Sequence, residues 1–184
     1  MILDNFIPFY NGDKCYLYYD TASKIIFKGY NEEFKPGISY YISITLTLSV
    51  CYGLNSILFK INNIYLNILI MLLGFLGACI ATFKTIKFAI NSLNKRMIKA
   101  DFSQQDMDFY VIEGKKQFKV QQFIIYSFFI LALVFSIFFV LFGNSFFMVF
   151  ATILWFLFFL IVKWIKPFPK SRFYKQYDRG GIIL

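Results

Sequence analysis

The sequence predicts an α-helical integral membrane protein. Its four transmembrane helices form two antiparallel hairpins and carry a small cytoplasmic β-hairpin subdomain. Two observations support this fold class. Of the 184 residues, 59% are hydrophobic and only 16% are charged, whereas soluble domains have roughly 45–50% apolar and 25% charged residues. Lys and Arg number 19 against 10 Asp and Glu, and these basic residues are concentrated outside the long apolar stretches.

Four stretches contain no charged residue, and each is at or near the roughly 17–25 residues that a helix needs to cross a bilayer. They are Ile38–Phe59, Ile64–Phe83, Phe123–Phe142 and Phe146–Val162. The connections after the first and third stretches are only a few residues long, which predicts two antiparallel hairpins. The predicted domains are a cytoplasmic β-hairpin segment (1–37), transmembrane hairpin 1 (38–83, with its second helix extending to about 99), a basic cytoplasmic loop (84–122), transmembrane hairpin 2 (123–162) and a basic cytoplasmic tail (163–184).

The distribution of basic residues predicts the orientation. An even number of spans places the N-terminal segment, the central loop and the tail on one side, and these hold every Lys and Arg except Lys60. By the positive-inside rule that side is the cytoplasm. We therefore expect a multi-pass protein of the plasma membrane with both termini cytoplasmic. Because the basic excess is explained by topology and no recognised nucleic-acid-binding module accompanies it, we expect no nucleic-acid partner.

The predicted spans contain no ionisable Asp, Glu, Lys, Arg or His side chain that could act in catalysis or transport. No Asp, Glu, Lys or Arg lies inside them and the chain has no His, which argues against ion-coupled transport and against His-based catalysis. Outside the spans, Asp106 and Asp108 are interpreted as solvated carboxylates. Cys15, Cys51 and Cys79 form no C-x-x-C pair. We therefore predict a protein that is not an enzyme, with no catalytic residue, cofactor or metal site.

Polar residues at i, i+4 spacing follow the first predicted helix. Interhelical packing is the simpler explanation, but the same ridge is a candidate docking surface for a membrane-inserted partner, and a water-lined pathway is a third option. The candidate partner-binding residues are Ser43, Thr47, Cys51 and Asn55.

The second predicted helix carries two overlapping small-xxx-small pairs, which allow close approach of another helix. The candidate helix-packing residues are Gly74, Gly77, Ala78 and Ala81. Packing within the chain is the simpler explanation, and a homo-oligomer stays open.

Two β-hairpins are predicted outside the spans. Cys15–Tyr19 and Lys24–Lys28 flank a turn at Asp20–Ser23, and Phe109–Ile112 and Gln117–Val120 flank residues 113–116. Because an isolated hairpin is only marginally stable in water, we expect the two hairpins to meet as one small sheet.

Local signals predict where helices begin and end. Ser103 with Asp106 predicts the start of a short helix. Near the C-terminus, Trp164 is typical of an interfacial anchor, and Pro167 with Pro169 predicts the end of the last span. The basic tail that follows is expected near anionic headgroups.

The N-terminal hairpin, Tyr16–Asp20 with Lys24–Phe27, followed by uncharged spans and a basic central loop, resembles small bacterial membrane immunity proteins. The resemblance is to the tandem five-transmembrane family that accompanies secreted toxins. It covers the general architecture over most of the chain, with four predicted spans where the family name gives five. It implies a protein that neutralises a membrane-targeting toxin by binding it in the producer's own membrane. The polar ridge of the first helix is then the candidate contact.

The alternative hypothesis is an accessory subunit of a membrane transport or secretion complex, in which the cytoplasmic sheet docks a soluble partner. A membrane-embedded enzyme acting on lipid has the least support, because no carboxylate or His is predicted at membrane depth.

Overall fold

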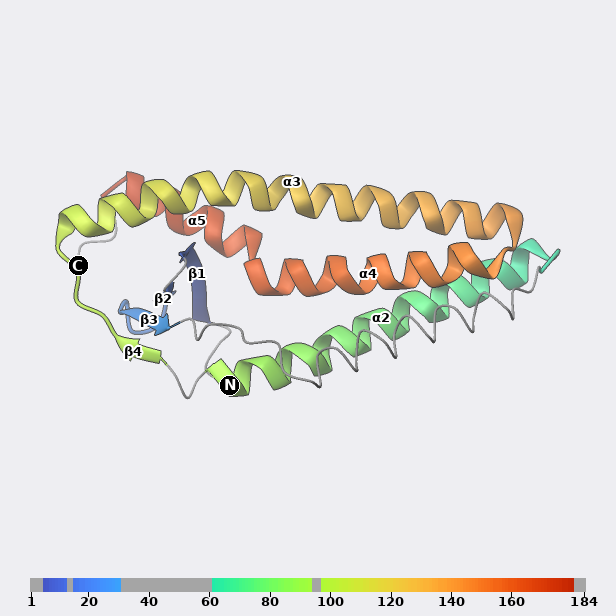
Figure 1. The fold of residues 1–184 in the computed structure, drawn as a ribbon, viewed down its shortest axis with the longest axis horizontal. Coiled ribbons are helices and arrows are strands. Elements are labelled where there is room, and N and C mark those ends of the chain that lie inside the picture. Colours follow the sequence, from blue (N-terminus) through green and yellow to red (C-terminus); the bar gives the residue numbers. More distant parts are fainter. Residues whose placement is uncertain (1–4, 13–14, 31–60, 94–96, 181–184) are drawn as a thin grey trace. The chain divides into compact units, whose positions relative to one another are not determined.

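The computed structural model describes residues 5–12, 15–30, 61–93 and 97–180 (Figure 1). This part of the chain is mostly helical. The helices are α2 (Ile64–Leu93), α3 (Gln104–Phe142), α4 (Ser145–Ile165) and α5 (Pro167–Asp178). By length and composition, three helical segments could cross a membrane, which supports a membrane protein. The first predicted span, 38–59, lies outside the described residues.

The chain divides into two compact units. We call the first the sheet unit; it comprises Met1–Glu32, Thr82–Ser127 and Phe159–Leu184. We call the second the membrane unit; it comprises Glu33–Ala81 and Phe128–Phe158. The three long helices contribute residues to both units, and each unit is described in turn.

The sheet unit contains one antiparallel sheet of four strands in the order β1-β2-β3-β4. The strands are β1 (Phe6–Asn11), β2 (Cys15–Asp20), β3 (Ile26–Tyr30) and β4 (Met97–Lys99). The N-terminal hairpin is confirmed, because β2 pairs with β3. Its turn is held by the Asp20 carboxylate, which accepts hydrogen bonds from the Ala22 N–H at 3.0 Å and the Ser23 hydroxyl at 2.6 Å.

The prediction of a second β-hairpin at 109–120 is wrong, since these residues belong to the 39-residue helix α3. The physical reason is that buried residues repeat every seven positions along this segment, over a longer range than the predicted hairpin. Val111, Phe118, Ile125, Ala132 and Phe139 are all buried, and their seven-residue spacing places them along one side of a helix. A short apolar run such as 109–112 does not by itself distinguish a strand from a helix.

The predicted start of a helix at Ser103 is confirmed, although the helix is long rather than short. The Asp106 N–H donates to the Ser103 hydroxyl oxygen at 3.2 Å, and that hydroxyl donates to the Asp106 carboxylate at 2.6 Å. These bonds satisfy groups that would otherwise lack partners in the first turn of α3.

The second predicted helix is shorter than expected. α2 ends at Leu93 and not near residue 99, because Met97–Lys99 forms strand β4 against β3. This pairing satisfies backbone groups along one side of β3 that would otherwise be unpaired. The sheet thus forms from the N-terminal hairpin together with β1 and β4, rather than from two hairpins.

Most of the basic C-terminal tail forms helix α5, which packs on the sheet. Lys166 adopts a left-handed conformation (φ 52°) and ends α4, and Pro167 then occupies the first turn of α5, a position where proline costs no hydrogen bond. Phe173 of α5 is 1% exposed. Its ring lies 5.0 Å from that of Phe9 and 5.1 Å from that of Tyr19. It therefore joins α5 to the core of the sheet unit.

One edge of the sheet, strand β1, is covered by helices. The Gln117 side chain of α3 accepts from the Asn11 N–H at 3.0 Å and donates to the Asn11 carbonyl at 2.7 Å. The Tyr174 hydroxyl of α5 donates to the Phe9 carbonyl at 2.5 Å. Gly114 makes this contact possible, because a Cβ there would collide with the Phe9 carbonyl oxygen. These contacts pair backbone groups of β1 that would otherwise be available to another strand at the edge of the sheet.

Lys170 of α5 is buried, with 2% of its surface exposed. Its ammonium donates to Gln121 at 2.9 Å and lies 5.6 Å from the centre of the Phe118 ring. Among the described residues no carboxylate forms an ion pair with it. Burial lowers the pKa of Lys170 to about 8, because the charged form loses its hydration.

We expect the Lys170→Met variant to be more stable than the wild type at pH 7. Below pH 8 the lysine is charged in the folded and unfolded states, and the fold carries the desolvation cost. Between pH 8 and pH 10.5, the ordinary pKa of lysine, only the unfolded state holds the proton. The free energy of unfolding of the wild type should therefore rise with pH over this range, by at most about 3 kcal/mol. Thermal unfolding between pH 7 and 10.5 measures this. Equal pH slopes in the wild type and Lys170→Met would contradict it.

Candidate functional site

Two short connections lie together at one end of the membrane unit. Residues 61–63 precede α2, and residues 143–144 join α3 to α4. The Ile61 N–H donates to the Gly143 carbonyl at 3.0 Å. The Asn63 side chain accepts from the Tyr65 N–H at 3.0 Å and so caps α2, and the Asn144 side chain accepts from the Phe146 N–H at 2.9 Å and caps α4. The two caps and the bond between the connections define this end of the unit.

Gly143 is required where α3 ends. Its φ is +64°, in the left-handed region that glycine adopts without steric cost. Its N–H donates to the Phe139 carbonyl at 2.8 Å, which closes the last turn of α3. A Cβ at this position would also collide with the Ile61 carbonyl oxygen. The close contact between the two connections therefore depends on the absence of a side chain.

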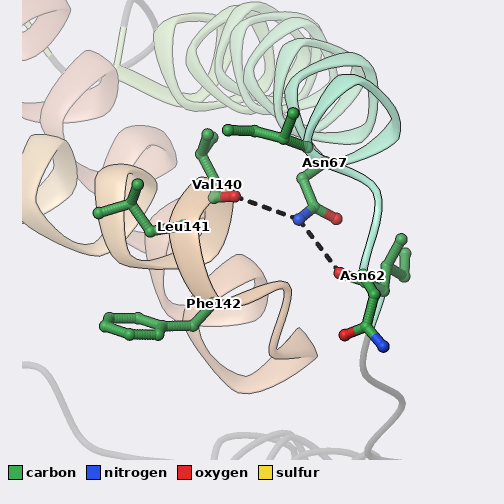
Figure 2. A pocket seen from close by; sticks show the side chains of 7 residues that line it. Asn62, Asn67, Val140, Leu141 and Phe142 are labelled. Carbon is green, nitrogen blue, oxygen red and sulfur yellow. Dashed lines mark hydrogen bonds between the residues drawn. The ribbon is translucent and has the colours of Figure 1, made fainter.

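Asn67 of α2 lies beneath these connections and is 2% exposed. Its amide nitrogen donates to the Ile61 carbonyl at 3.3 Å and to the Val140 carbonyl at 3.2 Å, as Figure 2 shows. Two carbonyl partners require a donor at this position, which fixes the orientation of the amide. Its oxygen is buried and has no hydrogen-bond partner in the described part of the chain, and the same holds for the Ser145 hydroxyl.

A pocket of about 220 Å³ adjoins Asn67 (Figure 2). Its lining combines two asparagines with apolar side chains, namely Ile61, Asn62, Ile64, Asn67, Val140, Leu141 and Phe142. The pocket lies at the C-terminal end of α3, where the helix dipole places partial negative charge. None of the lining side chains is ionisable, so the pocket is suited to binding a hydrogen-bond donor rather than to acid–base chemistry.

The structure separates the candidate packing residues of α2. Ala78 is buried with 3% exposure, and a Cβ on Gly74 would lie 2.8 Å from the Thr152 hydroxyl of α4, so α4 approaches α2 closely at Gly74. A Cβ on Gly77 would meet no atom of the described residues within 4 Å, and Ala81 is exposed. The polar ridge Ser43, Thr47, Cys51 and Asn55 lies outside the described residues.

The interior of the membrane unit is aromatic. Trp155 of α4 packs edge-on against Phe75 of α2 and Phe129 of α3, at ring distances of 4.9 and 5.8 Å. Its indole N–H donates to the Ser136 hydroxyl at 3.1 Å, and that hydroxyl donates to the Ala132 carbonyl at 2.6 Å. The polar groups of this cluster thus have partners, unlike the Asn67 oxygen.

Sequence reasoning missed Asn67. The signal available for it was an amide side chain in an uncharged span, four residues from a short connection. Comparisons of the chain with protein-family models, with curated proteins and with solved structures find no match.

Proposed function

We propose that the protein is a bacterial immunity protein of the plasma membrane, which neutralises a membrane-targeting toxin by binding it in the membrane without enzymatic activity. The pocket beside Asn67 is the observation that supports this proposal most directly, because it combines apolar walls with a buried acceptor that has no partner among the described residues. The described residues that line it carry no ionisable side chain, and recognition needs none.

The distribution of basic residues supports the orientation in this proposal. Within the described residues, the connections beside the pocket carry no Lys or Arg, whereas α5 and the extension of α3 before residue 120 carry many. The positive-inside rule then places the pocket at the outer face and the sheet unit in the cytoplasm. A toxin arriving from outside would meet the pocket first, together with the polar ridge of the first predicted span.

Protection of a sensitive strain tests this function. Cells expressing the protein should survive the toxin encoded beside its gene, and cells with an empty vector should not. Leu141→Trp should reduce protection at least tenfold, because Leu141 lines the pocket and is exposed enough to carry a larger side chain into it. Leu131→Trp is the matched control, because Leu131 is an exposed α3 residue that does not line the pocket. Unchanged killing with normal amounts of protein in the membrane would refute the proposal.

The second candidate is an accessory subunit that docks a cytoplasmic partner. A specific observation favours it, since Phe109 and Ile112 are 58% and 55% exposed on the part of α3 that precedes the uncharged span. Pull-down from detergent distinguishes the candidates. A cytoplasmic protein that co-purifies with the wild type and is lost from Phe109→Asp would favour the accessory subunit, whereas recovery of the secreted toxin would favour immunity.

A further inference from the structure

One buried hydrogen-bond acceptor at the pocket lacks a donor among the described residues. The two N–H groups of the Asn67 amide are already used by the Ile61 and Val140 carbonyls. Its oxygen is left over, and its burial is nearly complete. The same wall is formed by Val140, Leu141 and Phe142, the last residues of α3. The last carbonyls of a helix have no partner inside it. A buried oxygen without a hydrogen-bond partner, such as that of Asn67, costs about 1–3 kcal/mol. A ligand that donates a hydrogen bond to it would recover this free energy.

From this arrangement we infer that the pocket binds a protonated primary amine on a short alkyl stem. An ammonium group has three N–H donors and no acceptor, which suits the Asn67 oxygen and the last carbonyls of α3, all of them acceptors. Its positive charge is favoured at the C-terminal end of a helix, where cations are stabilised by about 0.3–1 kcal/mol. Ile61, Ile64 and Leu141 supply apolar surface for the methylenes.

The charge of the surroundings agrees with a cationic ligand. Among the described residues that line the pocket there is no Lys or Arg to repel it and no carboxylate to bind it more strongly. Binding of moderate affinity is therefore expected. The Asn67 oxygen is enclosed, so the ligand reaches it by displacing Asn62, which is exposed and lines the same pocket.

Three sources can present this amine, and the inference needs the proposed function only for the third. Lys60 precedes Ile61 in the sequence, a lipid headgroup can carry an aminoethyl group, and a membrane-bound toxin can carry a lysine.

The class of ligand is tested with n-butylammonium, using n-butanol and tetramethylammonium as controls. The probes are titrated into purified full-length protein in detergent, with the ¹⁵N-labelled side-chain amide of Asn67 observed by NMR. The measurements are made on the wild type and on Lys60→Gln, which frees the pocket if Lys60 occupies it. We expect n-butylammonium to shift the Asn67 signal at concentrations at least tenfold below those at which either control does. Leu141→Trp should abolish this shift, and Leu131→Trp should retain it.

Two results would overturn the inference. One is equal binding of n-butanol and n-butylammonium in both backgrounds, which would indicate a water-filled polar pocket. The other is unchanged n-butylammonium binding in Leu141→Trp. Because no toxin is present, either result is distinguishable from failure of the protection assay.

The source is then identified in nanodiscs. Preferential retention of phosphatidylethanolamine over phosphatidylcholine by native mass spectrometry would assign the amine to lipid. Preferential binding of a transmembrane peptide with a lysine over its norleucine analogue would assign it to a peptide. n-Butylammonium binding confined to Lys60→Gln would assign it to the chain itself.

Discussion

Gly114→Ala is expected to destabilise the sheet unit by about 1–5 kcal/mol, even though alanine favours helices over glycine by about 1 kcal/mol. The added Cβ would collide with the Phe9 carbonyl oxygen of β1 and would lie 2.7 Å from the Tyr174 hydroxyl. Both atoms belong to the buried hydrogen bond that joins α5 to β1. The variant therefore adds overpacking, at about 1–3 kcal/mol, to the loss of a buried hydrogen bond, at about 1–3 kcal/mol.

Hydrogen exchange of the β1 amides, measured on the full-length protein in detergent, tests this expectation. Exchange should accelerate at the Asn11 N–H, which bonds to Gln117 one helical turn beyond Gly114. Gly29→Ala is the control in the same sheet, because a Cβ there meets its nearest atom at 3.6 Å, an ordinary contact. Wild-type exchange in Gly114→Ala would mean that β1 does not pack against α3 as described.

Gly143→Ala is expected to destabilise the membrane unit by about 3 kcal/mol. A left-handed φ costs a residue with a side chain about 1–2 kcal/mol. The collision with the Ile61 carbonyl oxygen adds to this cost, because Ile61 cannot move aside freely. Its N–H donates to the Gly143 carbonyl, and its carbonyl accepts from the Asn67 side chain. The Asn67–Ile61 bond should weaken as the connections separate, and the pocket beside it should open.

The thermal midpoint of the detergent-solubilised protein, with hydrogen exchange at the Ile61 N–H, measures this effect. Gly180→Ala is the matched control, because its φ is +69° but its side chain would meet no atom within 4 Å. Gly180→Ala should lose only the free energy that a left-handed φ costs a residue with a side chain. Equal losses in the two variants would indicate that the contact between the connections contributes nothing.

Local patterns in the sequence were sufficient for some elements. The alternating aromatic and β-branched residues around Asp20 predicted the β2–β3 hairpin, and Ser103 predicted the start of α3, because these signals act within a few residues. The absence of charge over 64–83, 123–142 and 146–162 predicted the three apolar helices found in the described part of the chain.

Other elements depend on distant partners and could not be predicted in this way. The 109–120 segment resembles a hairpin in a short window, with Gly114 as its turn. From Val111 to Phe139 the buried positions of α3 instead follow a heptad pattern, and Gly114 lies where β1 approaches the helix. β4 is a strand because β3 is next to it. The predicted end of the last span at Pro167 is confirmed, since α4 ends at Ile165. The helix that Pro167 begins was not predicted, because it depends on the burial of Phe173 and Tyr174.

The candidate site was missed for the same reason. Asn67 gains its importance from Val140, 73 residues further along the chain. The predicted ridge on the first span lies outside the described residues and stays a prediction, as does the first span itself.

Cysteine labelling of intact cells most directly tests the central claim, that the apolar helices span the membrane with the pocket outside and the sheet unit in the cytoplasm. The three native cysteines are first replaced by Ser or Ala, and single cysteines are then introduced as Asn144→Cys beside the pocket and Asp101→Cys in the sheet unit. A membrane-impermeant maleimide should label the first variant in intact cells, and the second only after permeabilisation. Labelling of Asp101→Cys in intact cells, or protection of Asn144→Cys until permeabilisation, would contradict the proposed orientation.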